Sequence, residues 1–196
     1  MSFLIDLITF ATMQKKETNL ASFNNSWYKP GASVLKRINW YFISLVFFKS
    51  SFPINSIKVS LLKMFGAKVG KGLIIKPHVN IKYPWRLRIG NYVWIGEHSW
   101  IDNLGDIIIE DNVCISQGAM LLCGNHDYRK TSFDLIVGSI HLKKGSWIGA
   151  KSVVCPNVFV GSHAILTVGS VATQNMSDYT IYQGNPAQPI KERIIS

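Results

Sequence analysis

The chain has 196 residues, of which 47% are hydrophobic and 12% aromatic, which suffices for one globular domain and excludes a largely disordered chain. The net charge of +10 is uneven: residues 1–90 hold fourteen Lys/Arg and two Asp/Glu, whereas residues 91–196 hold seven and nine. A basic half indicates an anionic partner or a solvated, edge-protecting surface, and no recognition motif supports nucleic acid as that partner.

The N-terminal region, residues 1–65, is predicted to be helical, basic and aromatic. Its start, MSFLIDLITFAT, has neither the basic segment nor the cleavage site of a signal peptide. The apolar run Trp40–Phe48 is far shorter than the ~20 residues that span a bilayer. We expect helices from about Val34 to Lys49 and from about Asn55 to Phe65. The region either caps the first strands that follow or lies at an anionic membrane surface, and both interpretations stay open.

An aliphatic repeat begins after this region. Within trios the step is six residues and between trios it is eight, and after a gap the six-residue step returns. The members are Val69, Ile75, Ile81, Ile89, Ile95, Ile101, Ile109, Ile115, Leu121, Leu142, Ile148, Val154, Val160 and Leu166. A six-residue step cannot form the stripe of a helix, which needs spacings of three and four. It predicts a three-sided coil of short parallel strands, with one aliphatic residue per side pointing inward.

Three further columns follow the same register. Glycine often follows the aliphatic residue, and a small or branched residue lies four positions after it. The third position after it holds residues that tolerate positive φ: Gly72, Gly118, Gly145, Gly169, Asn112, Asn157, His78, His98 and His163. We interpret this last column as the corners, which gives three of the five histidines a structural role.

The repeat resembles the left-handed β-helix of the hexapeptide-repeat acyltransferases over roughly residues 66–193. FGAKVGKG, YPWRLRIGNY, VCISQGAMLLCGNHDYRKTSFDLI, SWIGAKSVVCPNVFVG and GNPAQPIKER are similar to sugar O-acetyltransferases of capsule and exopolysaccharide clusters, particularly the colanic-acid group. We therefore predict a mainly β chain: a left-handed parallel β-helix of about five coils over 66–173, a loop extruded near 123–141, and a coenzyme-proximal tail over 174–196.

The register lapses at the segment that begins GNHDY, where the repeat extrudes its loop. Transfer of an acetyl group to a hydroxyl needs a general base, and imidazole is suited to that role near neutral pH. The resemblance assigns the base to His126, at the start of the loop; His141 lacks motif support. Asp127, Asp102, Glu97 or a backbone carbonyl could orient the His126 ring.

The acceptor residues are predicted around the same loop. The resemblance places an acceptor-contacting asparagine near Asn103, although Asn is also an ordinary corner residue. We assign Asn103, Asp102 and Asp127 to acceptor binding.

The donor groove is predicted along the later coils. By resemblance, Trp147 lines the pantetheine arm of acetyl-CoA, although plain packing would also explain an indole there. Ala150, Val168 and Thr173 match groove positions, and Lys191 and Arg193 match residues that bind the coenzyme phosphates, with surface solvation as the alternative. Gln174 and Gln188 replace common Lys or Arg, a departure that weakens the phosphate assignment.

Cys114, Cys123 and Cys155 lack metal-type spacing and read as small buried residues of a reducing compartment. We expect no metal requirement, and direct transfer without an acyl-enzyme.

The resemblance further implies a homotrimer with sites between subunits, and a sugar or lipid-linked oligosaccharide acceptor. We expect a cytoplasmic enzyme, and the inner face of the membrane is a second location that the basic N-terminal region would suit. The alternatives are an acetyltransferase of this fold acting on serine, a xenobiotic or an amino sugar, and a non-catalytic β-helix scaffold.

Overall fold

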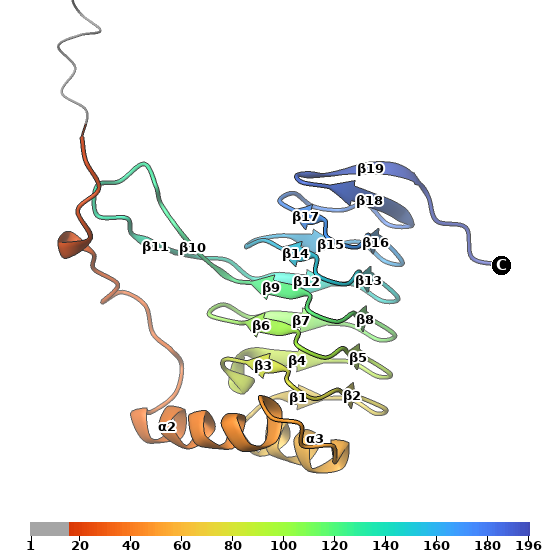
Figure 1. Cartoon of the computed structure of the whole chain (residues 1–196), viewed down its shortest axis with the longest axis horizontal. Helices are drawn as coiled ribbons and strands as arrows, with labels where there is room; N and C mark the ends of the chain where they lie inside the picture. The colour runs from red at the N-terminus through yellow and green to blue at the C-terminus, as the bar shows by residue number, and fades with distance from the viewer. Residues whose placement is uncertain (1–15) are drawn as a thin grey trace, which may run out of the picture. The chain divides into compact units, whose positions relative to one another are not determined.

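Short, mainly parallel strands stacked in three sheets and joined by turns organise the chain from Lys68 onward (Figure 1). The computed structural model describes residues 16–196, so the prediction about a signal peptide lies outside the described residues. Sheet A contains β1 (Lys68–Val69), β4 (Leu87–Ile89), β7 (Ile107–Ile109), β12 (Ile140–Leu142) and β15 (Phe159–Val160). Sheet B contains β2 (Ile74–Ile75), β5 (Trp94–Ile95), β8 (Cys114–Ile115), β13 (Trp147–Ile148), β16 (Ile165–Leu166), β18 (Thr180–Gly184) and β19 (Ala187–Glu192). Sheet C contains β3 (Asn80–Ile81), β6 (Trp100–Asp102), β9 (Met120–Leu122), β14 (Val153–Val154) and β17 (Val171–Ala172).

The three sheets confirm the predicted left-handed parallel β-helix. Five coils each supply one strand to each sheet, and strands of successive coils pair in parallel, as β4 does with β7. β18 continues sheet B beyond β16, and β19 returns antiparallel to it. The predicted tail therefore contains a hairpin that extends one sheet.

The inward column forms the core. Thirteen of its fourteen aliphatic residues are at most 4% exposed, and Val69 in the first strand is partly buried against the same cluster. The small or branched residues four positions later are also buried, including Ser99, Ser146 and Ser152 at 0%. The six-residue step thus corresponds to one side of the coil, as predicted.

The corner column has the predicted backbone. All nine residues that we placed there have φ between +57° and +69°. Tyr92 and Lys151 occupy the same column with φ of +56° each, so the fold imposes the left-handed conformation even on side chains that disfavour it. The glycine column has another cause: a Cβ on Gly149 would lie 2.6 Å from the Leu166 carbonyl oxygen of the next coil.

Two helices precede the first coil, at the residues expected. α2 (Val34–Ile43) begins at the N-cap Ser33, whose hydroxyl accepts from the Lys36 N–H, and α3 spans Asn55–Met64. The remainder of the first predicted helix is η2 (Ser44–Phe48), a π-helical turn. Two short 3₁₀ turns complete the elements, η1 (Leu20–Ser22) and η3 (Pro84–Arg86).

The helices close the open edge of the first coil. The Asn55 side chain accepts from the Ile75 N–H and donates to the Leu73 carbonyl. The buried Lys58 ammonium donates to the Lys76 carbonyl at 3.2 Å, and the Trp40 indole donates to the Ile81 carbonyl at 2.9 Å. These side chains replace the preceding coil that the edge strands lack.

The chain divides into two compact units. One comprises Lys29–Asn125 and Val137–Ser196, which is the β-helix with α2 and α3. The other combines the described residues up to Tyr28 with His126–Ile136. The extruded loop is a two-stranded ribbon of β10 (Gly124–His126) and β11 (Leu135–Val137), between β9 in sheet C and β12 in sheet A.

Candidate active site

His126 lies at the end of β10 in a setting built by the loop itself. Its Nδ1 is 2.8 Å from the Phe133 carbonyl oxygen, and the Phe133 ring stacks on the imidazole with centroids 4.5 Å apart. The ring of Phe23 lies 5.8 Å away in a tilted orientation. Because a carbonyl oxygen only accepts, Nδ1 must hold the proton, and Nε2 is then the basic nitrogen of the neutral ring. Among the orienting groups considered from the sequence, the structure therefore supplies the backbone carbonyl.

Asp127 follows His126 in the chain, but its carboxylate binds Arg129 of the same loop. Its Oδ1 is 3.1 Å from Arg129 Nε and also accepts from the Arg129 N–H. These hydrogen bonds hold the pKa of the Asp127 carboxyl below its usual range. A second ion pair joins Lys130 to Asp134 at 2.9 Å, so charged contacts brace the loop locally.

Asp102 and Asn103, at the end of β6, differ in what they can offer a ligand. Asp102 is 9% exposed, and its Oδ1 lies 3.0 Å from Lys82 Nζ, in an ion pair without hydrogen-bond alignment. Asn103 is fully buried, accepts from the Tyr83 N–H at 2.9 Å and donates to the Tyr83 carbonyl. Asn103 therefore holds the Tyr83 backbone, a structural role different from the corner residue considered from the sequence.

Trp147 stands on the outer face of sheet B. Its side chain is 44% exposed, and its indole N–H donates to the Ser116 hydroxyl at 2.9 Å. Below it in the ladder are Cys114 and then Trp94. A groove of about 320 Å³ on this face is lined by Trp94, Cys114 and Ser116 among others. The Trp147 indole thus donates to a hydroxyl that lines this groove.

The other predicted donor residues are distributed over several corners. Ala150 and Val168 occupy stacked turns beside Trp147, where the Ala150 carbonyl accepts from the Gly169 N–H. Thr173 follows β17 at the next corner of the coil. The structure therefore groups Trp147, Ala150 and Val168 along one edge and sets Thr173 apart.

Lys191 and Arg193, the two cations predicted to bind the coenzyme phosphates, differ in exposure and in their hydrogen bonds. Lys191 lies exposed on β19, opposite Ile181 of β18. Arg193 Nη1 donates to the carbonyls of Gly145 and His163, each at 3.1 Å. Arg193 thus ties the C-terminal strand to the corner between sheets A and B.

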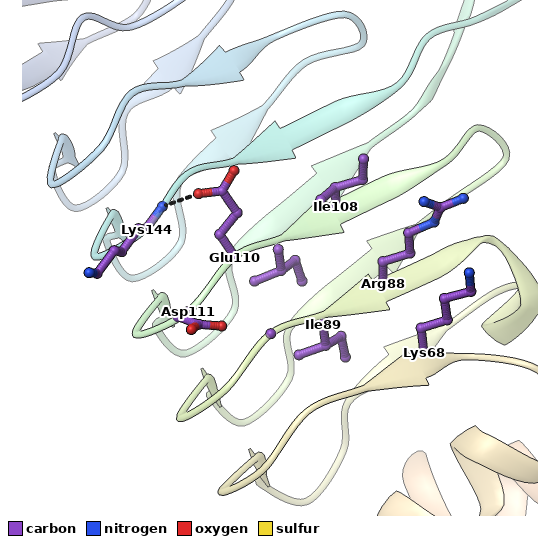
Figure 2. Close-up of a pocket in the computed structure, with 9 residues that line it drawn as sticks. Lys68, Arg88, Ile89, Ile108, Glu110, Asp111 and Lys144 are labelled. Carbon is purple, nitrogen blue, oxygen red and sulfur yellow. Dashed lines mark hydrogen bonds between the residues drawn. The ribbon is translucent and has the colours of Figure 1, made fainter.

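A separate groove of about 460 Å³ lies on the outer face of sheet A (Figure 2). Lys68 and Arg88 line one part, whereas Glu110, Asp111 and the Lys144 backbone, which donates to Glu110, line the other. None of the site residues predicted from the sequence lines this groove. His141, the poorer candidate for the base, is paired with Glu110 at 2.7 Å beside it.

The cysteines are not thiolates at neutral pH. Burial raises the pKa of Cys123 to about 12 and also raises the pKa of Cys114 and Cys155. Within residues 16–196 no group of three or more His, Cys, Asp or Glu side chains could hold a metal ion.

Sequence reasoning missed Trp94, Cys114 and Ser116 as groove residues. Trp94, Cys114 and Trp147 all directly precede an inward isoleucine, so the column before the core column identifies the outer face of sheet B.

The chain is similar in sequence and in fold to known acetyltransferases. The chain is 30% identical to the putative colanic acid biosynthesis acetyltransferase WcaF of Escherichia coli, over 85% of this chain and 92% of that protein. It is 28% identical to the galactoside O-acetyltransferase of E. coli, over 68% and 67% of the two chains. A hexapeptide-repeat acetyltransferase of Vibrio cholerae complexed with acetyl coenzyme A shares the fold, with a TM-score of 0.75, 21% identity, and coverage of 84% of this chain and 92% of that one. No family model matches the chain.

Proposed function

This chain belongs to the hexapeptide-repeat acetyltransferases, and we propose that it transfers an acetyl group from acetyl-CoA to a sugar hydroxyl of an exopolysaccharide, capsule or lipopolysaccharide precursor. The observation behind the mechanism is the hydrogen bond between His126 Nδ1 and the Phe133 carbonyl, since it leaves Nε2 as the proton acceptor. The similarity to a colanic acid biosynthesis acetyltransferase supports the polysaccharide sugar.

The reaction needs one base and no covalent enzyme intermediate. Nε2 of His126 removes the proton of the acceptor hydroxyl as its oxygen attacks the thioester carbonyl carbon. The tetrahedral intermediate then collapses, the carbon–sulfur bond breaks, and the imidazolium returns the proton to the departing thiolate. The Phe133 carbonyl stabilises the imidazolium formed in between.

Each substrate is assigned its own set of residues. Asp102 and Asp127 are proposed to bind the acceptor, and Asn103 contributes by holding Tyr83. Trp147, Ala150 and Val168 are proposed to line the acetyl-CoA groove, with Lys191 toward its phosphates. Thr173 and Arg193 stand at other corners, so we assign them the smaller share of donor binding.

Three prisms are proposed to form a trimer in which His126 of one subunit and Trp147 of the next share a site. Such heterologous contacts close into a ring under threefold symmetry. We place the enzyme in the cytoplasm, where acetyl-CoA is made, and at the inner face of the membrane. Within residues 16–196, no helix has the length and apolar character that crossing a bilayer requires.

The test follows release of the CoA thiol with a thiol reagent over a panel of polysaccharide-precursor sugars, galactosides, serine and amino sugars. His126→Ala should lower kcat/KM about 10²- to 10⁴-fold, the usual contribution of a general base. His98→Asn is the matched control, because His98 is an exposed corner residue with φ of +58° that Asn tolerates. Equal activity of His126→Ala and wild type would refute the assignment, and a preference for galactosides over polysaccharide precursors would refute the acceptor.

A further inference from the structure

A continuous apolar stripe is exposed along the N-terminal helix. Seven large side chains are between 41% and 68% exposed, and their spacing of one, three or four residues keeps them on one side of the helix. This α2 stripe consists of Val34, Leu35, Ile38, Tyr41, Phe42, Leu45 and Val46.

The opposite side of the same helix is already packed. Trp40 and Phe48 are at most 3% exposed, with rings 5.1 Å apart, and Trp40 also binds the first coil through its indole N–H. Apolar side chains therefore lie on both the packed and the exposed side of the segment Val34–Phe48, which also contains the polar residues Lys36, Arg37 and Asn39. A contiguous exposed patch of this kind marks an interaction surface with a partner or a membrane.

The charge of the surrounding sequence selects the partner. Between Glu17 and Glu97 there are twelve Lys/Arg and no Asp or Glu. Lys36, Arg37 and Lys49 belong to or directly follow the stripe helix. A second copy of this chain would bring the same positive charge against itself, whereas an anionic lipid surface attracts nearby Lys and Arg side chains.

We propose that the α2 stripe docks into the interface of an anionic membrane leaflet, with the helix lying in the membrane plane. Leu35, Ile38 and Phe42 would enter the boundary of the acyl chains, and flanking cations would contact the lipid phosphates, as in amphipathic surface helices. Because α2 closes the first coil, docking sets that end of the β-helix nearest the lipid. The proposal rests on the surface alone and holds whatever the acceptor of the reaction is.

The experiment measures sedimentation of the full-length protein with two kinds of vesicle, pure phosphatidylcholine and an equal mixture with phosphatidylglycerol. The test variant is Leu35→Ser/Phe42→Ser. The matched control is Ile194→Ser, because Ile194 is 88% exposed near the C-terminus. Both changes affect exposed positions, so thermal unfolding should match wild type, which separates lost docking from lost folding.

Wild type should bind the anionic vesicles at least about tenfold more tightly than the neutral ones, and raised salt should weaken this binding. Leu35→Ser/Phe42→Ser should lose about tenfold or more in affinity, and Ile194→Ser should lose nothing. The proposal would be overturned if wild type bound neutral and anionic vesicles equally well. It would also be overturned if Leu35→Ser/Phe42→Ser bound anionic vesicles as tightly as Ile194→Ser. A fall in oligomeric state in the double variant with vesicle binding unchanged would overturn it as well, since that result would identify a second copy as the occupant.

Discussion

The stacked coils and the His126 ribbon stabilise their side chains in opposite ways. In the coils, the place of a residue within the six-residue cycle determines whether it is buried, forms a corner or faces outward. In the ribbon, bonds between near neighbours do this work: Asp127 binds Arg129, Lys130 binds Asp134, and His126 binds Phe133. His126 is therefore held by contacts within the ribbon, on which the stacked coils do not depend. We expect mutations in the ribbon and in the core to have separate effects.

The largest expected effect breaks the stack. Ile101 is 0% exposed in the core column, and Ile101→Ala should lower the free energy of unfolding by about 2–5 kcal/mol through the cavity it leaves. The matched change in the ribbon is Ile136→Ala, at a residue 38% exposed, and should cost less than about 1.5 kcal/mol. Urea unfolding measures both, and similar losses would contradict the separation of core and loop.

The next prediction compares two residues with the same left-handed backbone conformation, one in the stacked coils and one in the ribbon. Lys151 at a corner and Phe133 in the ribbon both have positive φ, +56° and +52°. Lys151→Gly should leave the free energy of unfolding equal to wild type or higher by up to about 1 kcal/mol, because Gly relieves the left-handed strain. Phe133→Gly also relieves strain, but it removes the ring stacked on His126.

Phe133 is a positioning residue, so its replacement should appear in kinetics. We expect kcat to fall about tenfold in Phe133→Gly with an unchanged KM for acetyl-CoA, since a looser imidazole is aligned less often. Lys151→Gly should keep both constants. An unaltered kcat in Phe133→Gly would show that the Phe133 carbonyl alone orients the base.

The smallest effect concerns carboxylates in the two regions. Hydrogen bonds from Asn91 lower the pKa of Asp111 at a corner, and those from Arg129 lower the pKa of Asp127 in the ribbon. A folded pKa below the unfolded one means that each contribution to stability is present above the unfolded pKa and is lost as pH falls through the folded pKa. We expect the pKa of both carboxyls to lie below the usual value of 3.8 in carboxyl NMR. Titration of either at or above that value would show that its hydrogen bonds do not persist in solution.

Much of the stack could be predicted because each repeat position has one physical task. The fourteen aliphatic residues, the nine corner residues and the starts of both helices are where the pattern placed them. The positive φ of Tyr92 and Lys151 could not be predicted, because their side chains have no preference for this conformation. The stacking of neighbouring coils imposes it.

The site could be predicted only in part. The break in register identifies the loop and His126. The partner of His126 Nδ1 is a backbone carbonyl, and because every residue has one, the sequence does not predict which carbonyl it is. Asn103 and Arg193 are predicted to bind ligands by resemblance to the family, and in the structure both side chains hydrogen-bond to backbone groups.

By itself, the sequence determined the period of the fold, its inward and corner columns and the place where the coil opens, because these depend on hydrophobicity and backbone preference at regular spacing. Only the tertiary structure decided which polar side chains are committed to the scaffold and which face the grooves. Hydrogen bonds join residues of different coils, and the folded backbone alone determines which donors and acceptors meet.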